Sequence, residues 1–209
     1  DVDLADVHLV SATGTPVVVV LMASKPLVLP ASALGANALI WAASPGMAGG
    51  RAIAELVLGL IEPEGRLPIS FAVHAGQQPT YYNQVRGQHG ARYADLTQRP
   101  AFAFGEGLSY STVAFDDLRN EASTLGVDDV LRATVVVRNT GARPIVETVQ
   151  AYVRDVVTSA SWADRELKTF VKVRVAPGAS QTVTLELPVA ACSIVNAQGR
   201  RIVEPGDFE

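Results

Sequence analysis

The sequence predicts an α/β region followed by an all-β region. In the first third of the chain, continuous apolar runs of strand length alternate with turns and one amphipathic stretch, which is typical of a parallel sheet covered by helices. From residue 113 onward, short alternating segments follow one another between turn signals, which is typical of an antiparallel β-sandwich. The fold class is therefore expected to change along the chain, from a mostly parallel α/β sheet to an antiparallel β-sandwich.

The α/β region combines strand and helix signals in an order that favours a β-α-β repeat. Residues 3–12 carry apolar side chains at helical spacing and predict the end of a helix. Residues 16–22 and 38–44 lack polar alternation, which predicts two strands buried on both faces. The glycine-rich stretch 45–50 then leads into residues 51–61, which have the i, i+3, i+4, i+7 pattern of an amphipathic helix. The stretch EPEGRLPISF predicts a closing turn and a short strand.

The next segment has neither a helical nor a strand period, but it is rich in aromatic side chains. These predict an ordered linker held on the surface by its rings. The aromatic residues of the segment are Tyr81, Tyr82, Tyr93, Phe102, Phe104 and Tyr110.

The last part of the chain predicts about seven strands. The segments VLRATVVVRNTG and ETVQAYVRD alternate, and the second places Val149, Ala151 and Val153 on one face. This spacing favours a sandwich of the immunoglobulin or fibronectin type III kind. The expected domains are residues 1–75 (α/β), 76–112 (ordered linker) and 113–209 (β-sandwich).

Composition and charge exclude several classes of protein. The sequence has 209 residues, of which 48% are hydrophobic and 18% charged, as in a soluble globular protein. The net charge is −4, without the basic patch that nucleic-acid binding needs. No apolar run approaches the ~20 residues of a membrane span. The single cysteine, Cys192, lies in an apolar run and is expected to be a small buried hydrophobe. The compartment, whether cytoplasmic or secreted, stays open.

Ligands of open α/β sheets bind at the carboxyl ends of the strands, and this rule gives the candidate rim residues. Ser24 and Lys25 follow the first predicted strand, and Ser44 and Met47 follow the second. The glycine-rich stretch between Ser44 and the helix lacks the G-x-G-x-x-G and Gly-Lys-Ser/Thr patterns. A tight structural turn is therefore favoured over a phosphate site.

Acidic side chains are candidates for a catalytic pair, since some hydrolytic reactions, the hydrolysis of glycosides among them, need two carboxylates. Each candidate has an ordinary explanation as a solvated or linker residue, and no catalytic residue is assigned. The candidates are Glu55, Glu62, Glu64, Asp95, Glu106, Asp1, Asp3 and Asp6. The histidines His8, His74 and His89 share no metal-ligand spacing, so no metal site is expected. No cofactor is implied by the sequence either.

Successive strings resemble the signatures of glycoside hydrolase family 3, in order and over nearly the whole chain. The most specific are PEGRLPISF and FGEGLSYS, and others are TGTPVVVVL, ALIWAASPGMAGGRAIAELVLGLI, QQPTYYNQ, ETVQAYVRD, RELKTFVKVRVAPGASQTV and VEPGDF. The resemblance implies the C-terminal part of an α/β sandwich domain followed by a fibronectin type III-like domain. Both ends of the sequence give the expectation of a longer parent chain.

The resemblance further implies a retaining β-glycosidase that hydrolyses terminal β-D-glucosides or β-xylosides. Its substrates would be β-linked oligosaccharides or aryl and alkyl glycosides. The family's nucleophile belongs to an N-terminal (β/α)8 barrel, and its acid/base commonly lies upstream of the strand that PVVVVL matches. Both are therefore expected upstream of residue 1, with the fragment itself inactive. The sequence departs from the family at Met47 and Ala48, where a polar or acidic pair is common, and at Ser24 and Lys25, where glycine and a basic residue are usual.

Two other readings stay open. A non-catalytic carbohydrate-binding module would need a row of exposed aromatic rings on the sandwich, whose aromatic residues are Phe115, Tyr152, Trp162, Phe170 and Phe208. A purely structural module would fold and bind nothing. Because a sheet without its early strands has an exposed edge, partner pairing or a homodimer is also expected.

Overall fold

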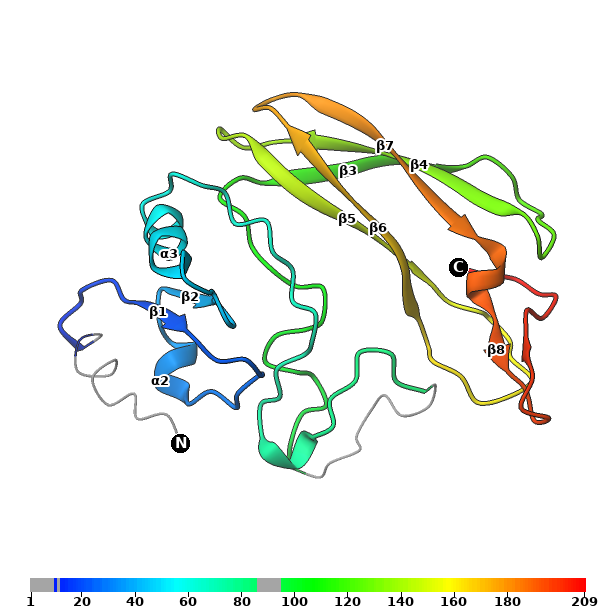
Figure 1. Ribbon diagram of the computed structural model, residues 1–209, viewed down its shortest axis with the longest axis horizontal. Helices are drawn as coiled ribbons and strands as arrows, with labels where there is room; N and C mark the ends of the chain where they lie inside the picture. The colour runs from blue at the N-terminus through cyan, green and yellow to red at the C-terminus, as the bar shows by residue number, and fades with distance from the viewer. Residues whose placement is uncertain (1–9, 11, 86–94) are drawn as a thin grey trace. The chain divides into compact units, whose positions relative to one another are not determined.

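The computed structural model describes residues 10, 12–85 and 95–209 (Figure 1). The chain divides into two compact units, which we call the α/β unit (Asp1–Ile61, Pro68–Thr80 and Arg99–Phe104) and the sandwich unit (Glu62–Leu67, Tyr81–Gln98 and Gly105–Glu209). The helix expected over residues 3–12 lies largely outside the described residues.

The α/β unit contains a short parallel sheet. Strand β1 (Val18–Leu21) pairs with β2 (Ala38–Trp41), with Val18 opposite Ala38. The parallel pairing is as predicted, but the described sheet has only these two strands. The prediction that these strands are buried on both faces is wrong, because in β1 Val19 is buried while Val18 is 44% exposed.

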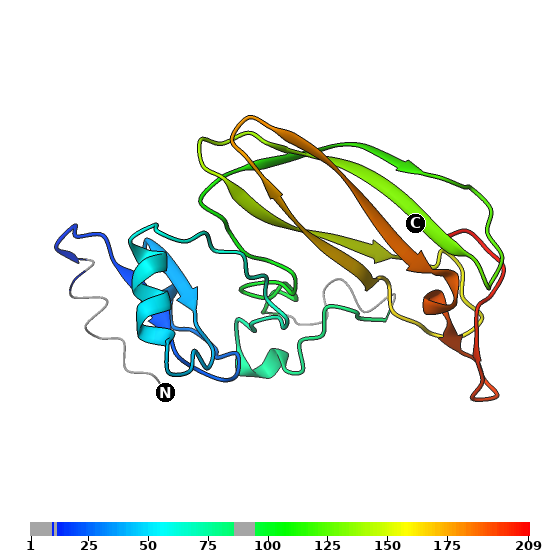
Figure 2. The same ribbon diagram turned by 45° about the horizontal axis from the view of Figure 1, so that its top comes forward.

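Two helices accompany this sheet. Helix α3 (Gly49–Val57) lies over one face of the strand pair in Figures 1 and 2, and the short α2 (Ala31–Leu34) precedes β2. Helix α3 ends before the predicted residue 61, and Gly59 then takes a positive φ of 70°, where glycine is favoured. In the part of the chain that the structure describes, no helix is long and apolar enough to span a membrane.

A bridge between Phe71 and Phe102 replaces the short strand expected at the end of the α/β region. The Phe71 amide donates to the Phe102 carbonyl at 2.8 Å, and the Ala101 amide donates to the Phe71 carbonyl at 2.8 Å. The Phe71 ring meets Trp41 edge to face at 5.3 Å and is itself 2% exposed. Trp41 is half-buried, and its indole nitrogen donates to the Ala23 carbonyl at 2.7 Å. The ring of Phe102, in the segment expected to be a linker, meets the Phe71 ring edge to face at 6.1 Å.

The sandwich unit contains the antiparallel strands that the alternating pattern predicts (Figure 2). One sheet has the order β3-β4-β7, a second pairs β5 with β6, and a small third sheet pairs β8 with β9. The strands are β3 (Val113–Asn120), β4 (Val130–Asn139), β5 (Ile145–Val153), β6 (Glu166–Val175), β7 (Ser180–Pro188), β8 (Ile194–Val195) and β9 (Arg201–Ile202).

The core of the sandwich lies between the two main sheets. Along β7, Val183, Leu185 and Leu187 are buried while their neighbours are exposed, as a strand with one solvated face requires. Strands from both sheets contribute to one buried cluster: Val135, Val137, Ile145, Val149, Val175, Val183 and Leu185.

A buried asparagine fixes the turn between β4 and β5. Asn139 is 1% exposed, and its amide nitrogen donates to the carbonyls of Arg143 at 2.7 Å and Val175 at 3.0 Å. Its carbonyl oxygen accepts from the Ser111 hydroxyl at 2.8 Å and the Gly141 amide at 3.0 Å. The polar atoms of this side chain are therefore satisfied inside the protein, which makes its burial affordable.

Candidate functional site

The loops that hold the four rim residues follow strands whose carboxyl ends lie at the same edge of the sheet. Ser24 and Lys25 follow β1, and Ser44 and Met47 follow β2. A hydrogen bond from the Trp41 indole to the loop after β1 joins the two segments. All four residues are exposed, so each can meet a ligand or a neighbouring domain.

The glycine-rich stretch before α3 makes a tight turn. Gly46 has a φ of 69°, and the Gly49 amide donates to its carbonyl at 3.1 Å. A Cβ on Gly49 would lie 2.4 Å from the Cβ of Pro45, so a side chain there would collide. These glycines have a structural reason in the turn itself, in agreement with the favoured interpretation.

Two of the glutamates that are candidates for a catalytic pair stabilise local structure. Glu55 accepts from the Nε of Arg51 at 2.6 Å, one helical turn away on α3. Glu62 accepts from the backbone amide of Tyr110 at 2.8 Å. Glutamates commonly form such ion pairs within a helix and accept such hydrogen bonds from loop amides, so neither residue needs a catalytic explanation.

Three further candidate carboxylates, Glu64, Asp95 and Glu106, are at least partly exposed. Glu64 pairs with Lys172 at 3.4 Å. Glu106 is exposed, and its backbone carbonyl accepts from the Leu67 amide at 2.8 Å. Asp95 is exposed as well. Asp1, Asp3 and Asp6 lie outside the described residues.

Histidine and cysteine have structural surroundings in this fold. The Nδ1 of His74 accepts from the Gly76 amide at 3.0 Å and caps a 3₁₀ turn, Ala75–Gln77. His8 and His89 lie outside the described residues, within which no cluster of metal-binding side chains occurs. Cys192 is partly buried, and burial raises the pKa of its thiol, which disfavours a thiolate nucleophile.

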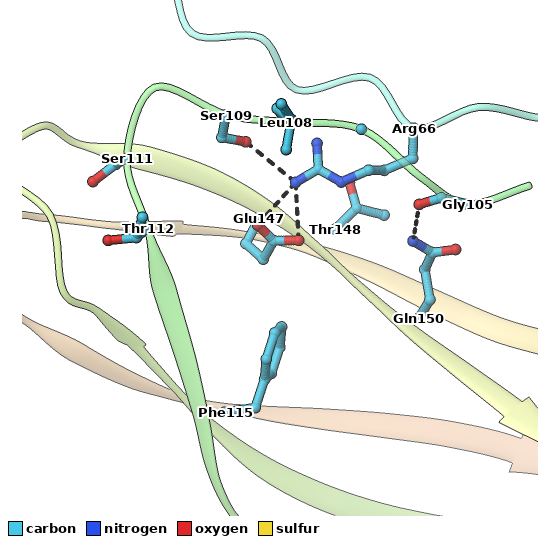
Figure 3. Close-up of a pocket in the computed structure, with 11 residues that line it drawn as sticks. Arg66, Gly105, Leu108, Ser109, Ser111, Thr112, Phe115, Glu147, Thr148 and Gln150 are labelled. Atoms are coloured by element: carbon cyan, nitrogen blue, oxygen red, sulfur yellow. Dashed lines mark hydrogen bonds and ion pairs between the residues drawn. The ribbon is translucent and has the colours of Figure 1, made fainter. Parts of the chain in front are cut away.

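A pocket in the sandwich unit surrounds a buried ion pair (Figure 3). The Nη2 of Arg66 donates to both carboxylate oxygens of Glu147, at 3.0 and 2.9 Å. The same nitrogen donates to the Ser109 hydroxyl at 3.2 Å, and that hydroxyl donates to the Pro63 carbonyl at 3.2 Å. The side chains of Arg66 and Glu147 are only 11% and 10% exposed. The pair therefore anchors the segment before the linker to strand β5.

Neither member of this pair was singled out from the sequence, although one signal was present. Glu147 stands two residues from both Ile145 and Val149, which belong to the buried core. Strand alternation thus places a glutamate among core positions, where a charge needs a partner. Arg66 belongs to the string PEGRLPISF, and nothing local in that string indicates which carboxylate it meets.

Comparison with known proteins shows which family the chain resembles. Residues 3–110 match the family model described as the glycosyl hydrolase family 3 C-terminal domain, and residues 147–209 match the fibronectin type III-like domain. The chain is 36% identical to the periplasmic beta-glucosidase of Salmonella typhimurium over 207 residues, which cover 94% of this chain and 27% of that protein. It is 32% identical to a beta-xylosidase of Formosa agariphila, over 97% of this chain and 28% of that protein.

A solved structure gives the same result. The chain matches that of a beta-glucosidase involved in saponin metabolism from intestinal bacteria with a TM-score of 0.91 and 51% identity, over 97% of this chain and 29% of that one. The matched regions define the C-terminal portion of a glycosidase. The chain belongs to glycosyl hydrolase family 3. It spans between a quarter and a third of the length of these relatives.

Proposed function

We propose that this chain is the C-terminal portion of a retaining β-glycosidase that hydrolyses terminal β-D-glucosides or β-xylosides. The observation that carries the proposal is the family match over residues 3–110, in a chain whose relatives are named beta-glucosidase and beta-xylosidase. Substrates of the whole protein would be β-linked oligosaccharides and aryl or alkyl glycosides.

In this proposal, the reacting carboxylates lie outside residues 1–209. Retention of configuration needs a nucleophile and an acid/base about 5–5.5 Å apart, and double displacement through a glycosyl-enzyme intermediate. Glu55 and Glu62 already hold local structure, and the chain spans only 27% of the Salmonella relative. The chain alone is therefore expected to be inactive, with the N-terminal barrel domain of the parent as its partner.

The α/β unit would be the C-terminal part of a larger α/β sandwich with a mostly parallel sheet. Its two described strands are four residues each, and apolar side chains beyond the end of α3 are exposed, including Leu58 (73%) and Leu60 (70%). Such a surface favours a covering partner. In the parent this would be the preceding part of the sheet, and in the isolated chain a second copy could cover it as a homodimer.

The rim residues would form walls of the outer sugar subsites. Ser24, Lys25, Ser44 and Met47 combine exposure with a position at the carboxyl end of a parallel sheet, where ligands bind in such folds. In the parent, Lys25→Ala and Ser44→Ala should raise KM for a cello-oligosaccharide by severalfold. Lys172→Ala, on the exposed side of the sandwich, is the control that should leave KM unchanged.

The sandwich would support the enzyme, and the rival proposal is a carbohydrate-binding or purely structural module. The rival draws on Phe115 and Phe170, which are 51% and 59% exposed. They belong to strands of different sheets, β3 and β6, so they do not form one row on one sheet. The enzyme proposal is therefore preferred for the parent.

The test compares the purified chain with the full-length parent on p-nitrophenyl β-D-glucoside and β-D-xyloside. Hydrolysis by the parent alone supports the proposal, and the ratio of the two kcat/KM values gives the preferred sugar. Hydrolysis by the isolated chain would contradict the placement of the carboxylates. An inactive parent that still binds the sugars would favour the carbohydrate-binding module.

A further inference from the structure

The pocket in the sandwich unit has the size and chemistry of a small-molecule site. Its volume is about 420 Å³, and it lies beside the first residues of β3 and the middle of β5 (Figure 3). Small-molecule pockets commonly measure about 300–1,000 Å³ and combine apolar walls with a few fixed polar groups. Here the fixed polar group is the Arg66–Glu147 pair, and an apolar wall is the ring of Phe115.

The polar side of the pocket carries no net charge. Arg66 neutralises Glu147 through its Nη2, so the site does not select a cation or an anion. A carboxylate has about four acceptor positions, and in the described structure the hydrogen bonds to Glu147 come from this one nitrogen. The remaining acceptor positions suit a neutral ligand that donates hydrogen bonds, and a hydroxyl is such a donor.

The apolar side is an aromatic ring that the sandwich leaves partly uncovered. Phe115 is paired in register with Val137, so the two side chains point to the same face of their sheet. Val137 is fully buried, whereas Phe115 is 51% exposed, because β3 is an edge strand and the facing sheet has only two described strands. The pocket thus offers one flat apolar surface, the ring of Phe115, and one polar group, the carboxylate of Glu147.

We propose that this pocket binds one neutral sugar ring. The C–H face of the ring would lie against Phe115, and neighbouring hydroxyls would donate to the carboxylate of Glu147. The Ser109 hydroxyl, fixed by Arg66 and Pro63, would be a further acceptor. That the ligand is a sugar, and not another polyol, rests on the proposed function. The site would hold a glycoside without cleaving it, because it offers a single, neutralised carboxylate where hydrolysis needs two.

Binding is tested by titrating the ¹⁵N-labelled chain with methyl β-D-glucoside, methyl β-D-xyloside and, as a polyol control, glycerol. Saturable amide shifts at Ser109, Thr112 and Glu147 with a glycoside, and none with glycerol, are expected. Phe115→Ala should weaken binding about tenfold, which corresponds to about 1.4 kcal/mol, because the variant lacks the apolar surface for the ring face. Phe170→Ala is the matched control, a ring of similar exposure (59% against 51%) outside the pocket, and should leave the affinity unchanged.

Absence of saturable shifts with both glycosides would overturn the proposal, and so would equal losses from the two phenylalanine variants. If Phe115→Ala loses its dispersed spectrum, Phe115→Leu keeps apolar bulk without the ring and should weaken binding in the same direction. Binding is measured on this chain and hydrolysis on the parent, so the two proposals fail separately. If the parent hydrolyses aryl glycosides and the pocket residues show no saturable shifts, only the proposed sugar site is contradicted.

Discussion

The α/β unit and the sandwich unit differ in how much of their structure they complete by themselves. Strands of the sandwich's two main sheets are 8–10 residues long and enclose one buried cluster drawn from both sheets. The described sheet of the α/β unit has two strands of four residues each. Apolar residues at the end of α3 stay exposed, among them Leu58 and Leu60.

This difference indicates which of the two units can be stable without a partner. Two sheets that face each other bury apolar surface from both sides, which is the main source of stability in a sandwich. A two-stranded sheet is marginal on its own and leaves backbone groups at both edges. We therefore infer that the sandwich folds by itself, whereas the α/β unit needs the covering partner proposed above. The two tryptophans report on the two units separately, Trp41 on the α/β unit and Trp162 on the sandwich.

The largest effect should come from the buried ion pair. Glu147→Gln leaves Arg66 charged and only 11% exposed, so the free energy of unfolding of the sandwich should fall by about 3–5 kcal/mol. Denaturant unfolding of a Trp41→Phe background, in which Trp162 is the sole indole, measures this. The matched control is Glu186→Gln, which removes an exposed partner of Arg132 and should leave the midpoint unchanged. Equal shifts for both variants would contradict the anchoring role of the pair.

Leucine truncations in each unit should have unequal effects. Leu185→Ala removes a buried side chain that is 6% exposed, which should cost the sandwich about 3 kcal/mol. Leu60→Ala removes one that is 70% exposed and should change the stability of the isolated chain by less than about 0.5 kcal/mol. Thermal unfolding followed by circular dichroism distinguishes them. In the parent, Leu60→Ala should lower the stability by more than it does in the isolated chain, because a covering domain would bury that side chain.

The smallest effect should be the pH dependence from Glu166. Burial alone would raise the pKa of Glu166, but hydrogen bonds from Lys168 at 2.9 Å and Trp162 at 3.1 Å lower that pKa below its ordinary value. A depressed pKa contributes stability above the unfolded value of about 4.3, and this contribution is lost as pH falls through the folded pKa. At pH 7 the Lys168→Met variant should therefore have a lower free energy of unfolding than the unsubstituted chain. The difference should be a fraction of that expected for Glu147→Gln. This difference in stability should narrow below about pH 4. A difference that does not change with pH would contradict a depressed pKa of Glu166.

The regular strands were predictable from the sequence because their burial alternates. Strand β7 shows this most clearly, with Val183, Leu185 and Leu187 buried and their neighbours exposed. Parallel pairing of β1 and β2 also followed from local signals, whereas their exposure did not. Burial of a strand depends on what covers it, and the covering elements are not part of the local pattern.

The pocket could not be predicted, because it depends on residues far apart in the chain. Arg66 and Glu147 are 81 positions apart, and no local pattern joins them. The exposure of Phe115 likewise depends on the width of the facing sheet. The four rim residues were found by a topological rule, and the structure places their loops after neighbouring strand ends. Their role in binding stays a prediction.

Native-state hydrogen exchange on the isolated chain tests the difference between the units most directly. The amides of β4 and β7 should be the most protected, and those of β1 and β2 should exchange at least about a hundredfold faster, since local stability follows buried contacts. In the parent, the β1 and β2 amides should gain protection. Equal protection of both sheets in the isolated chain would contradict the account, because the α/β unit would then need no further protein to complete it.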